Sequence, residues 1–128
     1  MTITHAIYLV TDIDLGASFL SGLLGFEVTA DENSWNGERF FTMADPGGSG
    51  LALQLIVADF QPEFAERKRA SDIVDFILDT DDMMALLEKV KLAGLSIHKA
   101  PMEVPYGITA IFEDPFGNLW DLVQRGQV

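Results

Sequence analysis

The side chains of this 128-residue chain that could do chemistry are mainly carboxylates. Twenty Asp and Glu residues stand against eight Lys and Arg residues and two histidines, His5 and His98. The chain has no cysteine, which excludes a disulfide framework, a thiolate metal site and a cysteine nucleophile. It also has no glycine-rich phosphate loop, serine nucleophile elbow or paired-histidine metal motif. What remains are carboxylates and imidazoles, which bind cations or move protons.

The formal net charge of −12 limits the classes of partner. A surface of this sign repels polyanions, so we expect no nucleic acid and no anionic membrane as partners. The same field favours a cationic small molecule, although an acidic composition also serves solubility alone. The first residues lack the features of a signal peptide, and no run reaches the roughly 20 apolar residues of a membrane span. A cytoplasmic location is therefore expected.

The elements that must position these groups follow one order in the first half of the chain. A strand is predicted over residues 5–10, and the capping residues after it begin a helix whose apolar stripe ends at Gly25. Three further strands are predicted, the last two separated by the turn Asp45-Pro46-Gly47-Gly48; they cover residues 26–28, 39–43 and 51–57. The first half is therefore one βαβββ unit.

The second half repeats this order. A strand over residues 73–78, a helix from Met83 that ends at Gly94 and three more strands are predicted, the strands at 95–98, 107–112 and 119–124. Gly25 and Gly94 lie 69 positions apart, as do the two Asp-Pro turns at 45–46 and 114–115, which favours a duplication. With 48% hydrophobic residues, the chain should fold as a single domain over 1–128, with module 1 at 1–58, a connector at 59–70 and module 2 at 71–128.

Two local predictions concern the second half. The polar connector should contain one helical turn, and its basic residues 67–69 should form a solvated face. Period-two alternation puts Val74, Phe76 and Leu78 against the following helix, so that Asp75 points the other way. The same rule makes Trp120 and Leu122 core residues, on the opposite face from Asp121.

Three stretches together resemble a known family: residues 5–12 with 23–26, residues 81–94, and residues 113–124. The last stretch is the most specific, because an Asp-Pro turn, a glycine and an asparagine precede a strand with an inward carboxylate. In these features the chain resembles the vicinal-oxygen-chelate superfamily, which includes glyoxalase I, bleomycin-resistance proteins and extradiol dioxygenases.

The resemblance implies an α+β fold in which two βαβββ modules form an incomplete, curved mixed β-barrel around a cavity. In metal-dependent members the ligands come from the first and last strand of each module, and the matching positions here are His5, Gln54, Asp75 and Asp121. Such a set could hold one divalent metal such as Mn, Mg, Ni or Zn, with Asp121 as the catalytic group that moves a proton. Aspartate at position 121, in place of the usual glutamate, and the absence of a histidine at position 75 depart from that pattern.

Two functions remain open at this stage. The leading hypothesis is a metal-independent, bleomycin-resistance-like protein that binds a small cationic or aromatic molecule, with Trp35, Phe41 (or Phe40) and Tyr106 as ligand contacts. The alternative is a metal-dependent lyase or isomerase of the glyoxalase I type. His5 could instead be a structural partner of a carboxylate, and the aromatic residues could be core. The resemblance also implies a homodimer.

Overall fold

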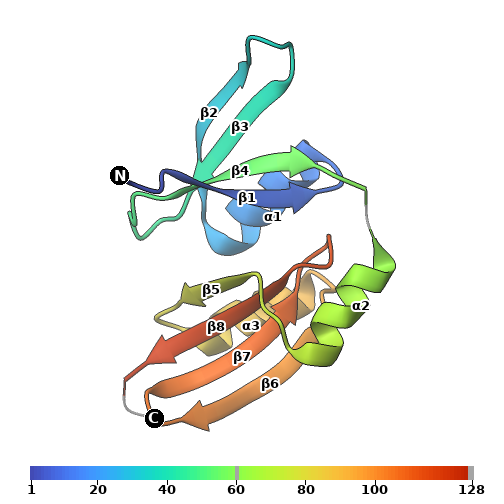
Figure 1. Cartoon of the computed structure of the whole chain (residues 1–128). Helices are drawn as coiled ribbons and strands as arrows, with labels where there is room; N and C mark the ends of the chain where they lie inside the picture. Colours follow the sequence, from blue (N-terminus) through green and yellow to red (C-terminus); the bar gives the residue numbers. More distant parts are fainter. Residues whose placement is uncertain (60, 127–128) are drawn as a thin grey trace. The chain divides into compact units, whose positions relative to one another are not determined.

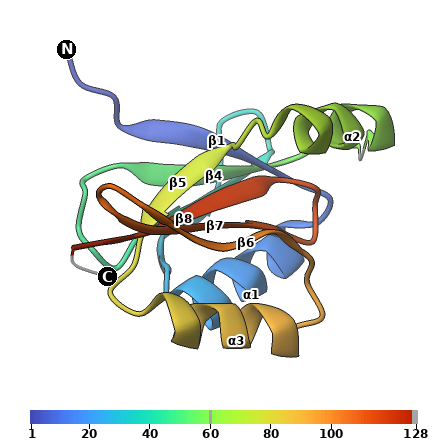
Figure 2. The same ribbon diagram turned by 90° about the horizontal axis from the view of Figure 1, so that it is seen from below.

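The computed structural model describes residues 1–59 and 61–126, and the chain divides into two compact units, Met1–Phe60 and Gln61–Val128. Each unit contains one βαβββ module with a four-stranded mixed sheet that does not close on itself (Figures 1 and 2). The expected α+β class and the two-module organisation are confirmed. In the described part of the chain, the helices are too short or too polar to traverse a lipid bilayer.

The first unit contains, in order, β1 (His5–Val10), α1 (Ile13–Leu24), β2 (Glu27–Asn33), β3 (Arg39–Ala44) and β4 (Ala52–Val57). Its strand order is β1-β4-β3-β2, with β1 and β4 parallel and the other pairs antiparallel. The side chain of Asp12 caps α1 by accepting the N–H of Leu15 at 2.9 Å, and Gly25 ends the helix in the left-handed conformation (φ 74°). One face of the sheet, which includes Tyr8 and Leu55, is buried with α1.

The second unit begins with α2 (Pro62–Ser71) and continues with β5 (Phe76–Asp79), α3 (Met83–Leu92), β6 (Ile97–Val104), β7 (Gly107–Glu113) and β8 (Leu119–Arg125). Its strand order, β5-β8-β7-β6, repeats that of the first unit. Trp120 is fully buried and stacks on Phe112 with ring centroids 6.3 Å apart and on Phe76 at 4.5 Å. The prediction that Trp120 is a core residue is confirmed.

The order of the elements and the turns agree with the sequence predictions, and the differences concern where individual strands begin or end and how long the helix before β5 is. β2 and β6 run further than expected, and β5 begins at Phe76 rather than at residue 73. The segment predicted to hold one helical turn forms the ten-residue helix α2. This helix has a proline in its first turn and Lys68 and Arg69 in its last, which suit a helix start and the helix dipole. Because it lacks an apolar stripe, hydrophobic periodicity did not predict it.

Candidate functional site

Asp121 lies on β8, on the sheet face opposite α3. Its register partners are Ile77 on β5 and Ile111 on β7, so three side chains from adjacent strands point the same way. Met83 of α3 donates its N–H to Gln124 on the other face of β8, which fixes the side that the helix covers. Asp121 therefore stands among aliphatic neighbours on the face that α3 does not cover.

One oxygen of the Asp121 carboxylate, Oδ1, is buried and has no hydrogen-bond partner among the described residues. Burial raises the pKa of this carboxyl above its ordinary value. The ion pairs of the described residues all use other carboxylates, namely Asp14, Asp31, Asp72, Asp75, Asp79 and Glu113. A buried carboxylate oxygen without a donor is costly to keep, so its presence points to a group supplied from outside the chain.

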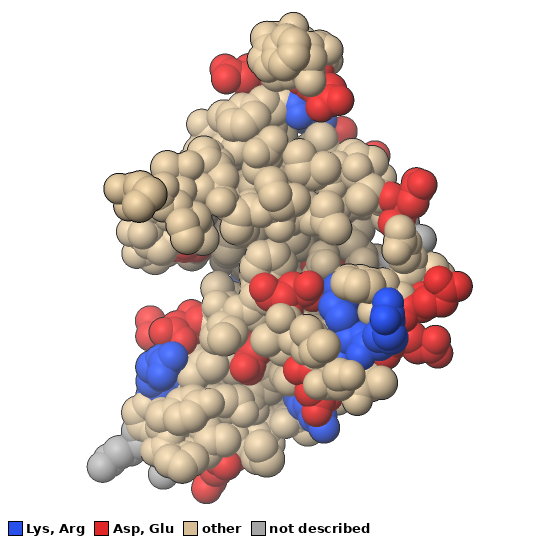
Figure 3. Space-filling model, viewed as in Figure 1, with Lys and Arg blue, Asp and Glu red and all other residues tan. Residues whose placement is uncertain are grey.

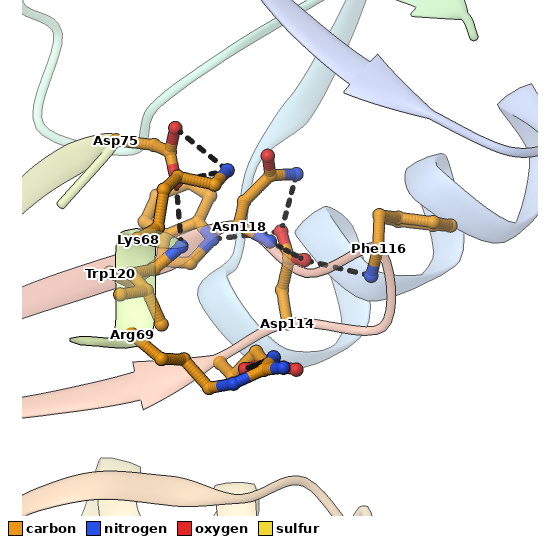
Figure 4. A network of polar contacts seen from close by, with 9 residues as sticks. Lys68, Arg69, Asp75, Asp114, Phe116, Asn118 and Trp120 are labelled. Carbon is orange, nitrogen blue, oxygen red and sulfur yellow. Dashed lines mark hydrogen bonds and ion pairs between the residues drawn. The ribbon is translucent and has the colours of Figure 1, made fainter. Parts of the chain in front are cut away.

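Asp75 lies just before β5 and is already engaged. Its carboxylate accepts hydrogen bonds from Lys68 Nζ at 3.1 and 3.2 Å and from the N–H of Leu119 at 2.8 Å (Figure 4). The predicted alternation is present, since Phe76 is half-buried against Trp120 while Ile77 is exposed. Asp75 thus shares a face with Asp121, but its charge is neutralised within the chain.

His5 and Gln54 lie on the face of the first sheet opposite α1. Gln54 stands in register with Ile7 of β1 and Thr42 of β3, and its side chain is half-buried. The His5 ring is exposed, with Nδ1 2.9 Å from Thr4 Oγ1 and its edge toward Phe40 at a centroid distance of 6.1 Å. The four predicted metal ligands therefore occupy two sheet faces, two residues on each.

These donors do not fit a divalent metal well. A metal ligand needs a free lone pair directed at the ion, whereas Lys68 and a backbone N–H hold the Asp75 carboxylate, and an ammonium group beside it repels a second cation. Among the residues that the structure describes, no group of three or more His, Cys, Asp or Glu side chains could hold a metal ion. We therefore derive no catalytic step through a metal.

The three aromatic residues predicted to contact a ligand lie in different surroundings. Trp35, in the turn between β2 and β3, is 97% exposed, and Tyr106, between β6 and β7, is 53% exposed with the guanidinium of Arg125 5.6 Å from its ring centroid. Phe41 is only 4% exposed, because the alternation of β3 turns it to the α1 side of the sheet. Its burial does not favour a ligand contact, and Phe40 is the residue of the pair that faces the His5 side.

Sequence reasoning missed Lys68. The basic residues 67–69 were predicted to form a solvated face, but Lys68 is only 9% exposed. Its ammonium group lies 5.3 Å from the ring centroid of Phe64, one turn earlier in α2, in addition to its bonds to Asp75. A helical reading of residues 62–71 would have placed Lys68 on the same side as Phe64 and Ala65.

The turn before β8 forms a hydrogen-bond network centred on Asp114. One carboxylate oxygen accepts the N–H groups of Phe116 and Asn118 at 2.8 and 2.9 Å, and the other accepts Asn118 Nδ2 at 3.1 Å and Trp120 Nε1 at 3.0 Å (Figure 4). The Asp-Pro turn, which was the most specific part of the resemblance, thus fixes the start of β8, the strand that carries Asp121.

Comparison with known proteins agrees with this architecture. The family model described as Glyoxalase/Bleomycin resistance protein/Dioxygenase superfamily matches residues 2–122. The chain belongs to this superfamily. A relative from Shewanella frigidimarina (strain NCIMB 400), described as an uncharacterized protein, is 32% identical over 126 residues, which cover 96% of this chain and 93% of the relative.

Two solved structures of the superfamily illustrate its range. TnmS3, an antibiotic binding protein from Streptomyces sp. CB03234, is 25% identical with a TM-score of 0.74, and the match covers 98% of this chain and 97% of TnmS3. A mutant of the fosfomycin resistance protein FosX from Listeria monocytogenes, complexed with Mn(II), is 17% identical with a TM-score of 0.72; the match covers 98% of this chain and 90% of FosX. The second likeness shows the fold alone.

Proposed function

We propose that this protein binds a small organic cation without a metal ion, and that Asp121 is its anchor. The observation that carries the proposal is the buried, unpartnered Oδ1 of Asp121 between the aliphatic register partners Ile77 and Ile111. A protonated amine would supply the missing donor and the missing positive charge together. The net charge of −12 would draw such a cation toward the protein.

The rest of the ligand should be apolar and planar. Ile77 and Ile111 flank Asp121 with aliphatic surface, and the accessible ring of Tyr106, in the same unit, is a candidate to stack on an aromatic group. The likeness to an antibiotic binding protein supports a binding rather than a catalytic role. The metal-dependent lyase or isomerase is less well supported, because Lys68 occupies the carboxylate of Asp75.

Tryptamine and N-acetyltryptamine form a suitable pair of probes, because they share the indole ring and differ in the charged amine. After dialysis against a chelator, we expect tryptamine to bind at least about tenfold more tightly, since a hydrogen bond to a charged group contributes about 1.5–3 kcal/mol. Asp121→Asn should remove that preference. Glu88→Gln, which makes the same charge change on the exposed surface of α3, should preserve it.

The pH profile of tryptamine binding adds a second measurement. The ammonium group keeps its proton below about pH 9, so the affinity should follow the ionisation of Asp121. Because burial raises the pKa of Asp121, affinity should be full above that raised value and fall as the pH drops through it, with a midpoint above the ordinary 3.8. Equal affinities for the two probes, or binding that requires added Mn²⁺, would overturn the proposal.

A further inference from the structure

Lys68 is a buried cation in a protein rich in carboxylates. On the molecular face drawn in Figure 3, blue basic side chains gather over α2, yet Lys68 itself is only 9% exposed. A buried ammonium group is stable only when it is paired, and Nζ lies within 3.2 Å of both carboxylate oxygens of Asp75. Lys68 of α2 and Asp75, the residue before β5, therefore form an ion pair within the second unit.

This pair decides how much charge the sheet face presents. Asp75 and Ile77 point to the same face, and Ile77 is the register partner of Asp121. Without Lys68 the face would carry two carboxylates that pair with no basic residue, Asp75 and Asp121, a pattern that attracts a divalent ion or a diamine. With Lys68 in place, Asp75 is paired and Asp121 remains without a basic partner among the described residues.

The neighbouring residue provides a contrast. Arg69 follows Lys68 in α2 and pairs with Glu113 at 2.7 Å, at the end of β7. Its side chain is 38% exposed, against 11% for that of Lys68, so water screens the Arg69 pair more strongly. By the same alternation Glu113, two residues after Ile111 on β7, also lies on the face of Asp121. Lys68 and Arg69 therefore each pair with a carboxylate of this face, and the Lys68 pair is the less exposed of the two.

We propose that Lys68 is a specificity-determining residue: its ammonium group permanently occupies the cation position at Asp75, so that the face accepts a monocation at Asp121 and rejects divalent cations. The monocation part rests on the proposed function, whereas the exclusion of divalent cations does not. An incoming divalent ion at Asp75 would have to displace a lysine that has no other carboxylate partner among the ion pairs of the described residues.

The test uses Mn²⁺ alone as the probe, with free Mn²⁺ followed by electron paramagnetic resonance. The wild-type protein should bind Mn²⁺ only weakly, and Asp75→Asn should leave that weak binding unchanged. Lys68→Met should bind Mn²⁺ at least about tenfold more tightly, and Lys68→Met/Asp75→Asn should lose the gain. Arg67→Met removes the same charge one residue away, at an exposed position that forms no ion pair with a carboxylate among the described residues, and should show no such gain.

Several outcomes overturn the proposal. It fails if wild-type protein binds Mn²⁺ tightly through Asp75, or if Lys68→Met gains nothing, or if Arg67→Met gains as much. Lys68→Gln, which keeps a hydrogen-bond donor near Asp75, replaces Lys68→Met if the latter does not fold, as judged by circular dichroism. Tryptamine titration of the same proteins separates the two proposals. If the wild-type protein does not bind tryptamine, the proposed function is refuted, but the exclusion of Mn²⁺ by Lys68 is not affected.

Discussion

Asp114 accounts for the strongest sequence signal at the scale of single residues. The residue is 3% exposed, and both oxygens of its carboxylate accept N–H groups, including the indole N–H of Trp120. The equivalent Asp45 in the first unit accepts hydrogen bonds from the exposed turn residue Ser49 and from the N–H groups of Gly47 and Gly48, all within its own turn. The duplicated Asp-Pro turn thus has a buried aspartate at the centre of a hydrogen-bond network in the second unit, whereas in the first unit it is a surface turn.

This contrast leads to a prediction for the matched variants Asp114→Asn and Asp45→Asn. At position 114 the new NH₂ group must face N–H donors, so we expect a loss of about 2–4 kcal/mol in the free energy of unfolding. At position 45 the amide can still accept the Ser49 N–H and donate to its hydroxyl, so the change should stay within about 0.5 kcal/mol. Urea denaturation measures both, and equal losses would contradict the assignment of Asp114 as the centre of the network.

The candidate site was only partly predictable from single residues. The position of Asp121 on the strand face opposite Trp120 followed from alternation after the Asp-Pro turn, and the register with Ile77 and Ile111 agrees with it. That its Oδ1 lacks a partner could not be predicted, because this depends on where every basic side chain goes. The pairing of Asp75 with Lys68 likewise depends on α2, a helix that the polar sequence of residues 62–71 did not predict.

At the scale of elements, α1 shows how closely a helix packs on its sheet. A Cβ atom at Gly16 would lie 2.7 Å from Val10 Cγ1 and 3.0 Å from Leu55 Cδ2, whereas one at Gly22 would have no neighbour within 4 Å. Both glycines lie within α1 and have a helical backbone, so they differ only in how closely other side chains pack against them. The close approach at Gly16 lets β1 and β4 pack against α1.

Alanine at each glycine should therefore have opposite effects. Gly22→Ala should stabilise the protein by about 0.5–1 kcal/mol, because alanine favours the helix and meets no atom. Gly16→Ala gains the same propensity but overpacks the contact, so we expect a net loss of about 1 kcal/mol. Chemical denaturation of the two variants beside wild type gives the difference, and a stabilised Gly16→Ala would show that α1 can shift away from the sheet at no cost.

At the scale of the whole molecule, repetition was the most informative property of the sequence. The spacing shared by Gly25 and Gly94 and by the two Asp-Pro turns predicted two modules, and both sheets have the same strand order. What repetition could not predict is where the modules diverge, as in the helix α2 that begins the second unit. Because α2 is polar, its sequence shows no hydrophobic period that would have predicted it.

We predict that the protein forms a homodimer in solution. Among the residues that the structure describes, each outer strand of a sheet (β1 and β2, or β5 and β6) has a single strand partner. β1 also exposes Ile7 and Leu9 on the face opposite α1. A second copy could cover this apolar edge. Because two chains of charge −12 repel each other, association should strengthen as salt is raised from about 50 to about 300 mM.

Sedimentation equilibrium at high micromolar concentration checks the mass, which should approach twice the 14.1 kDa of the chain. Leu9→Glu places a charge on the exposed face of β1 and should shift the equilibrium toward monomer by about tenfold or more, because a charge would then have to be desolvated at the interface. Leu92→Glu adds the same charge to an exposed position of α3 and should have only the small effect of the added net charge. A monomer at both salt concentrations would contradict the dimer, while equal effects of the two variants would place the contact elsewhere than β1.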